Sequence, residues 1–251
     1  MRIIYLANNR TGLEVLKYLR GRREKIAGLV VHPVQKQKFG KEIIEASGLP
    51  PEAIFDGSRL NEQVVLEKIR ALRPDIGISV FFGYMLRQGF LSLLPEGCIN
   101  LHPAFLPFNR GAYPNVWSIV DGTPAGVTLH YVDAGVDTGD IIARKEVEAE
   151  PIDTGESLYL KLERESLNLF RRSWPAVKSG RAERIPQSRT EGTIHRVSDV
   201  DGLDEIDLNR SYTAGELINI LRARSFPPYK GAWFRQGNRR IYMRLELFYE
   251  E

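Results

Sequence analysis

The chain alternates short, continuous apolar runs with longer stretches in which apolar residues recur every three or four positions. The continuous runs have the length and composition of strands buried on both faces. The spaced stretches, such as Leu13, Leu16 and Leu19, place apolar side chains on one side of a helix. Strands are expected at 3–7, 26–32, 76–82, 98–101, 126–132 and 141–149, and helices at 13–21, within 35–47, and at 61–73, 90–94 and 158–178. This order predicts the α/β class, with an open, mostly parallel, doubly wound sheet of Rossmann-like type.

The pattern changes after the long helix. We expect a large α/β domain at 1–186, a linker or arm at 187–206, and a small α+β appendage at 207–251. Thr213 and Glu216 form a capping-box pattern ahead of an apolar helical stripe, and Gly237 marks the turn of a hairpin. The appendage is too short for a five-stranded OB barrel. Its hairpin could pair with a second copy across a two-fold axis, so a homodimer is possible.

Composition excludes several classes of protein. The 251 residues are 43% hydrophobic and 27% charged with a net charge of +3, which is ordinary for a globular protein. Cys98 is the single cysteine and the four histidines are scattered, so neither a disulfide nor a bound metal is expected. Residues 207–251 carry eight Lys or Arg against five Asp or Glu, which is too weak a patch to predict a nucleic-acid partner. Without a signal peptide or a membrane-spanning run, no membrane association and a cytoplasmic location are expected.

Two polar side chains stand together at the end of the 98–101 strand. Alternation along that strand puts Asn100 and His102 on one face, and Pro103 ends the strand just after them. An Asp-rich loop at 133–140 follows the 126–132 strand, so one of its carboxylates can reach the imidazole if the two strands are neighbours. Such a trio suits attack of a neutral nucleophile on a carbonyl, although a capping or packing histidine explains the same residues.

The carboxyl ends of parallel strands share one edge of a sheet, where ligands bind. We therefore expect the loops after residues 7, 82, 101 and 132 to converge on one cleft. The first of these loops carries Asn8, Asn9, Arg10 and Thr11, which suit a phosphate or sugar hydroxyl at a helix start, or a polar helix cap.

The motif N-L-H-P-x-x-L-P-x-x-R-G, followed by V-D-x-G-V-D-T-G-D-I, resembles the active-site signature of the folate-dependent formyltransferase family. The resemblance implies that Asn100, His102 and Asp137 are catalytic and that the donor is N10-formyltetrahydrofolate. It also assigns the pterin to the loop of Phe82, Gly83, Tyr84, Met85 and Leu86, and to the backbone of Asp133, Ala134 and Gly135. For the first of these segments, a turn with core side chains is the alternative, and for the second an ordinary Asp/Gly turn.

The resemblance also bears on the acceptor. The form R-G-x-x-P-x-x-W, which begins at Arg110, resembles the methionyl-tRNA and sugar branches more than the glycinamide ribonucleotide branch. Arg110 is a candidate for the acceptor side, with a surface ion pair as the alternative. Because the appendage is short, we expect the acceptor to be a nucleotide-linked amino-deoxysugar destined for surface polysaccharide or glycan. A methionyl-tRNA formyltransferase with a reduced C-terminal domain, a formyltetrahydrofolate hydrolase and a non-catalytic folate-binding protein remain alternatives.

Overall fold

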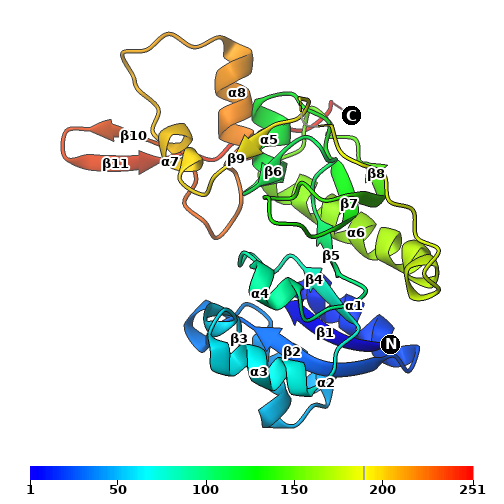
Figure 1. The fold of residues 1–251 in the computed structure, drawn as a ribbon. Helices are drawn as coiled ribbons and strands as arrows, with labels where there is room; N and C mark the ends of the chain where they lie inside the picture. The colour runs from blue at the N-terminus through cyan, green and yellow to red at the C-terminus, as the bar shows by residue number, and fades with distance from the viewer. Residues whose placement is uncertain (189, 251) are drawn as a thin grey trace. The chain divides into compact units, whose positions relative to one another are not determined.

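A computed structural model describes residues 1–188 and 190–250 (Figure 1). The chain forms two compact units, each assembled from several segments. The first comprises residues 1–102, 128–144 and 166–187, and the second comprises residues 103–127, 145–165 and the described part of 188–251. The division into 1–186, 187–206 and 207–251 stays a prediction.

A seven-stranded sheet dominates the first unit. Its strands follow the order β3-β2-β1-β4-β5-β7-β8, so the order reverses between β1 and β4. The first five strands pair in parallel, whereas β7 pairs antiparallel with β5. The bounds are β1 Arg2–Ala7, β2 Lys25–Val31, β3 Ile54–Asp56, β4 Ile76–Val80, β5 Cys98–His102, β7 Gly126–Tyr131 and β8 Ile141–Glu146. The α/β class and the mostly parallel sheet are therefore confirmed, while β3 was missed because it is only three residues long.

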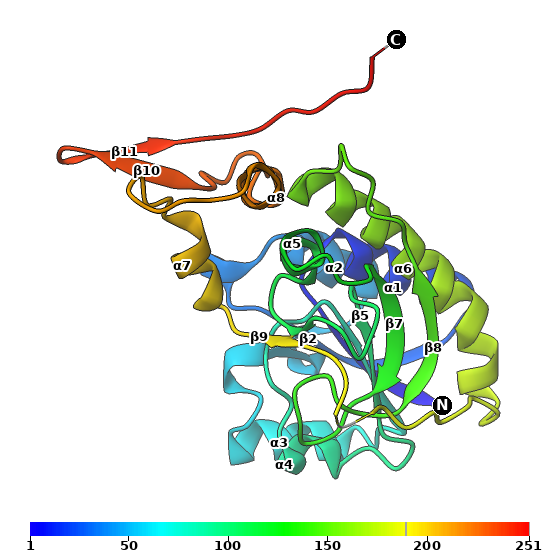
Figure 2. The same ribbon diagram turned by 90° about the horizontal axis from the view of Figure 1, so that it is seen from above.

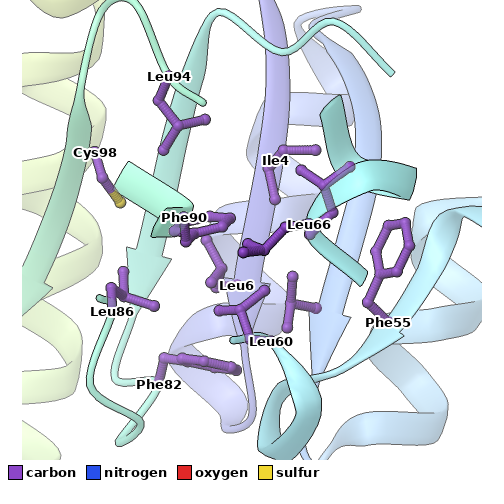
Figure 3. Close-up of a cluster of buried hydrophobic side chains, with 12 residues drawn as sticks. Ile4, Leu6, Phe55, Leu60, Leu66, Phe82, Leu86, Phe90, Leu94 and Cys98 are labelled. Atoms are coloured by element: carbon purple, nitrogen blue, oxygen red, sulfur yellow. The ribbon is translucent and has the colours of Figure 1, made fainter. Parts of the chain in front are cut away.

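Helices cover both faces of this sheet (Figure 2). Ile4 and Leu6 of β1 point to one face, where Phe55, Leu66 and Phe90 complete a buried apolar cluster (Figure 3). Tyr5 points to the other face, and its hydroxyl donates a hydrogen bond to the carbonyl of Gly12 in α1. The helices that lie wholly in this unit are α1 Arg10–Gly21, α2 Gly40–Ser47, α3 Gln63–Ala71 and α4 Gln88–Leu91, and α6, Gly155–Lys178, contributes its C-terminal half.

The second unit is built around two packed helices, α5 and α8. Thr213 caps α8 and forms the expected capping box with Glu216. Buried Asn109 donates hydrogen bonds to the hydroxyls of Ser118 and Thr123, at 2.9 and 2.8 Å. The remaining elements are β6 Arg110–Gly111, α5 Pro114–Val120, β9 Ile194–His195, α7 Asp199–Asp204, α8 Ala214–Ala223, β10 Trp233–Gln236 and β11 Arg239–Tyr242. The expected hairpin is present as β10 and β11, with Gly237 in its turn, whereas α7 was not expected.

Candidate active site

Strands β5 and β7 bring the polar residues of the site onto one face of the sheet. Asn100 lies directly opposite His130, and His102 lies opposite Thr128, in an antiparallel register. Because side chains alternate along a strand, these four residues share a face. His102 and His130 are almost completely buried, so their imidazoles are positioned by packing as well as by hydrogen bonds.

Asp137 approaches this face from the loop between β7 and β8. Its Oδ2 lies 3.5 Å from Nε2 of His102, and its Oδ1 lies 3.5 Å from Nε2 of His130. The amide of Asn100 donates to the same Oδ1 at 3.4 Å. The trio expected from the sequence is thus assembled around one carboxylate, together with a second imidazole that was not expected.

The route of this loop differs from the expected one. Since β7 runs antiparallel to β5, its carboxyl end does not lie at the edge where the parallel strands end. The rule of converging carboxyl ends therefore does not account for Asp137. The loop instead turns back toward the sheet, and Asp137 adopts a left-handed backbone conformation with φ of 52°.

Local contacts fix the shape of this loop. The carboxylate of Asp133 accepts hydrogen bonds from the Gly135 amide at 3.0 Å and from the Thr138 hydroxyl at 2.6 Å. Gly139 has no room for a side chain, because a Cβ there would lie 2.0 Å from the carbonyl oxygen of Tyr131. Asp133, Ala134 and Gly135 are exposed. The contacts of Asp133 show that it stabilises a turn, and the binding of the pterin by the backbone of these residues stays a prediction.

His130 has its tautomer set by its surroundings. Its Nδ1 lies 2.7 Å from the carbonyl oxygen of Tyr131, an acceptor only, so Nδ1 carries the proton. Nε2 then presents a lone pair, to which the Asn100 amide donates at 3.3 Å. His130 was missed from the sequence, although its place in the 126–132 strand would have shown it once the antiparallel register was known.

The site combines an amide, two imidazoles and a carboxylate, all of them wholly or partly shielded from water. A carboxylate near an imidazole favours the protonated ring and orients it. Amide and imidazolium donors stabilise negative charge that develops on a carbonyl oxygen. The arrangement therefore suits nucleophilic addition to a carbonyl, with a nucleophile supplied by a substrate. No group of three His, Cys, Asp or Glu able to hold a metal ion occurs among the described residues.

The loop after β4 mixes core residues with exposed ones. The side chains of Phe82 and Leu86 are buried in the apolar cluster, whereas Met85 is 61% exposed and Gly83 is also exposed. His32, at the carboxyl end of β2, hydrogen-bonds the carbonyl of Phe82, and its ring lies 4.6 Å from that of Tyr84. Burial lowers the pKa of His32, so its ring is neutral at neutral pH and donates that hydrogen bond. A pterin-binding role for this loop stays a prediction.

The loop after β1 has clear structural roles. Asn9 caps α1, since its side-chain oxygen accepts from the Gly12 amide at 3.0 Å. Asn8 is tied to the segment before α2, donating to the carbonyl of Lys36 and accepting from the amide of Lys38. Thr11 is buried and Arg10 is exposed. The helix thus begins at Arg10 rather than at residue 13, and substrate binding by these residues remains untested.

Arg110 belongs to the second unit. One guanidinium nitrogen donates to the carbonyl of Ser188 at 3.2 Å, within that unit. In the same unit, His195 stacks on Trp117, with ring centroids 4.1 Å apart and an interplanar angle of 8°. A role for Arg110 on the acceptor side stays a prediction.

Residues 1–173 match the formyl transferase family, and residues 199–249 match the N-formyltransferase dimerization C-terminal domain. The chain belongs to the formyl transferase family. The first match contains every residue of the carboxylate site described above. No helix in the described part of the chain has both the length and the apolarity needed to cross a membrane.

The chain is also similar to individual proteins and solved structures of this family. The chain is 35% identical over 172 residues to a dTDP-4-amino-4,6-dideoxyglucose formyltransferase of Mycobacterium tuberculosis H37Rv, covering 67% of this chain and 73% of that protein. A 4-N formyltransferase from Francisella tularensis superposes with a TM-score of 0.85 and 27% identity, over 99% of this chain and 98% of that one. A formyltransferase from Anoxybacillus kamchatkensis was solved with a UDP-linked formamido sugar and tetrahydrofolate. It superposes with a TM-score of 0.58 and 28% identity, over 80% of this chain and 89% of that one. Methionyl-tRNA formyltransferases also match.

Proposed function

We propose that this formyl transferase moves a formyl group from N10-formyltetrahydrofolate to the primary amine of a nucleotide-linked amino-deoxysugar. The observation that carries the transfer chemistry is the carboxylate of Asp137 between His102, His130 and Asn100. Support for the sugar acceptor comes from the likeness to the Mycobacterium and Francisella enzymes, the second of which spans nearly the whole of both chains. The amino sugar named for the Mycobacterium enzyme is therefore the first acceptor to test.

In the proposed reaction the unprotonated sugar amine attacks the formyl carbon, and the carbonyl oxygen gains the negative charge. His102, protonated beside Asp137, donates to this oxygen and stabilises it. The Asn100 amide donates to the same oxygen after giving up its hydrogen bond to His130 or to Asp137. Both of these hydrogen bonds are at the long end of the usual range. As the bond from carbon to N10 breaks, a proton leaves the amine and reaches N10 through His102 or water, giving the formamido sugar and tetrahydrofolate.

Release of tetrahydrofolate in three parallel reactions tests this proposal. One contains dTDP- and UDP-linked amino sugars, one initiator methionyl-tRNA, and one no acceptor. We expect release with an amino sugar alone. Release with tRNA alone would identify a methionyl-tRNA formyltransferase, release without any acceptor would identify a hydrolase, and binding of folate without release would identify a non-catalytic protein.

The match of residues 199–249 to a dimerization domain supports a homodimer as the working form. The hairpin β10–β11 lies within this match, and the terminal segment after it exposes Phe248 and Tyr249, at 84% and 60%. Exposed aromatic side chains next to a hairpin suit burial against a second copy. Light scattering measures the mass in solution, and a monomeric mass at assay concentration would contradict the homodimer.

A further inference from the structure

A short segment after α6 crosses the β7–β8 hairpin, and we call residues 184–187 the strap. Its Ile185 exchanges two backbone hydrogen bonds with Ile141 at the start of β8, at 2.8 and 2.9 Å. The guanidinium of Arg184 lies over the ring of Tyr131, 3.5 Å from its centroid, at the end of β7. The strap is therefore attached to the last residue of one strand and the first residue of the next, the two ends of the Asp137 loop.

Gln187, the last residue of the strap, contacts the Asp137 loop directly. Its side-chain Nε2 donates to the carbonyl oxygen of Asp137 at 2.9 Å and to that of Gly139 at 2.7 Å. A primary amide has two N–H donors, so one nitrogen satisfies both carbonyls. These bonds are short and the side chain is partly buried, so water competes with them less than at an open surface.

The backbone of the loop follows a special course that has to be held in place. Asp137 has a positive φ, and Gly139 lies so close to the carbonyl of Tyr131 that no Cβ would fit there. The contacts of the Asp137 carboxylate with Asn100, His102 and His130 are long, from 3.4 to 3.5 Å. Its position therefore depends on how firmly the backbone of the loop is held.

We propose that Gln187 is a positioning residue for the formyl transfer, which holds the backbone of Asp137 so that its carboxylate faces His102. This inference rests on the proposed function for its effect on catalysis, whereas its effect on the loop does not depend on that function. Gln187 acts through the carbonyls of Asp137 and Gly139, and not through substrate.

Two substitutions separate the hydrogen bonds of Gln187 from its bulk. Gln187→Met keeps the length of the side chain and removes both donors. We expect kcat to fall about 10- to 100-fold, the order of loss that a small misplacement of a catalytic group produces, while KM for donor and acceptor stays near the wild-type value. Glu183→Gln, an exposed position in the same connection, is the matched control and is expected to keep wild-type kcat.

Gln187→Glu tests the hydrogen bonds through the pH dependence of kcat, which a purely structural role of the side chain would not change. Its ionised carboxylate has no donor for the two carbonyls, but the protonated form regains one O–H donor. We expect the ratio of kcat in Gln187→Glu to kcat in wild type to rise as pH is lowered. The same ratio for Gln187→Met should not change with pH. An equal pH profile for both variants would overturn the positioning role.

Hydrogen exchange measured by mass spectrometry tests the loop independently of activity. In Gln187→Met, amides in the peptide 133–140 are expected to exchange faster than in wild type, while those of β1 stay protected. Unchanged exchange at 133–140 would overturn the inference, as would wild-type kcat in Gln187→Met. Absence of formyl transfer by the wild-type protein would count against the proposed function, and the exchange result would then decide the role of Gln187 by itself.

Discussion

The carboxylate of Asp137 lies 3.4 to 3.5 Å from side-chain nitrogens of Asn100, His102 and His130. The site is sensitive to each of these neighbours, because removing one partner of a shielded polar group leaves the other partner unsatisfied. His130 and Asn9 are the two residues at which structural and catalytic roles are most easily separated.

His130→Phe is expected to reduce both stability and activity. The phenyl ring fills a similar volume in a position that is 1% exposed, but it leaves the Asn100 amide without the imidazole nitrogen that accepts its hydrogen bond. We expect the free energy of unfolding to fall by about 1 to 3 kcal/mol and kcat to fall with it. Urea unfolding and the rate of tetrahydrofolate release measure the two effects, and His130→Gln, which keeps an acceptor for Asn100, should lose less. A Phe variant with wild-type stability and kcat would remove His130 from this account.

Asn9→Ala distinguishes a helix cap from a substrate ligand. Loss of the hydrogen bond to the Gly12 amide is expected to lower the free energy of unfolding by about 1 kcal/mol. Asn9→Asp keeps the cap and should be nearly as stable as wild type. If Asn9 only caps α1, KM for the acceptor is unchanged in both variants, whereas a marked rise in KM with Asp would assign it to a phosphate-binding role.

At the scale of elements, patterning and turn residues were enough to predict most of the strands and helices of the first unit. A strand was expected at 98–101 because an apolar lead runs into an alternating N-x-H pattern, and the structure extends it to His102. Helix α8 was expected because Thr213 and Glu216 form a capping box. The direction of β7 was not predictable, because an apolar run reads the same in parallel and antiparallel pairing. The place of Asp137 and the partnership with His130 both depend on that direction.

The strap could not be predicted for a related reason. Residues 181–198 are polar and lack periodicity, which is typical of a linker, and Gln187 was accordingly placed in an arm. Its contacts are made with residues about 50 positions earlier in the chain, where local pattern carries no information. The resemblance in contrast singled out Asp137, because a motif points to individual residues without showing how the fold brings them together.

Helix α6 is fastened to the first unit by a buried carboxylate, and this contact gives stability a pH dependence. Glu24, 4% exposed, accepts hydrogen bonds from Trp174 at 3.0 Å and from Lys178 at 2.8 Å. Burial alone would raise the pKa of Glu24, but the hydrogen bonds and charge of Lys178, with the Trp174 bond, outweigh it and lower the pKa. A lowered pKa in the folded state stabilises the fold above the ordinary value of 4.5, and this contribution is lost as pH falls through the folded-state value.

Glu24→Gln is therefore expected to lower the free energy of unfolding by about 1 to 3 kcal/mol near neutral pH, because a charged acceptor is replaced. The difference from wild type should shrink as pH falls below the ordinary Glu value of 4.5. Urea unfolding at several pH values measures it, with Glu14→Gln at an exposed ion pair as the control. A difference that stays constant with pH would show that the charge of Glu24 is not responsible.

At the scale of the whole molecule, the family match covers the sheet and its site, and a separate match covers the C-terminal segment. The sequence motif identified the formyl transferase chemistry, whereas the pattern of the C-terminal residues predicted only a small α+β appendage. These residues match a dimerization domain of N-formyltransferases, a relation that a helix and a hairpin alone do not reveal. The sugar-modifying relatives support the acceptor proposed above.

The most direct test of the account is the product formed from dTDP-4-amino-4,6-dideoxyglucose and N10-formyltetrahydrofolate, measured by mass spectrometry with wild type and with Asp137→Asn. The account predicts that wild type adds the mass of one carbonyl group to the sugar nucleotide. Asp137→Asn, shown to be folded by circular dichroism, should form this product about 10²- to 10⁴-fold more slowly, because in the proposed reaction the carboxylate of Asp137 stabilises the protonated form of His102. Formation of the same product by Asp137→Asn at the wild-type rate would contradict the role given to the site, and no formylated sugar with wild type would contradict the acceptor.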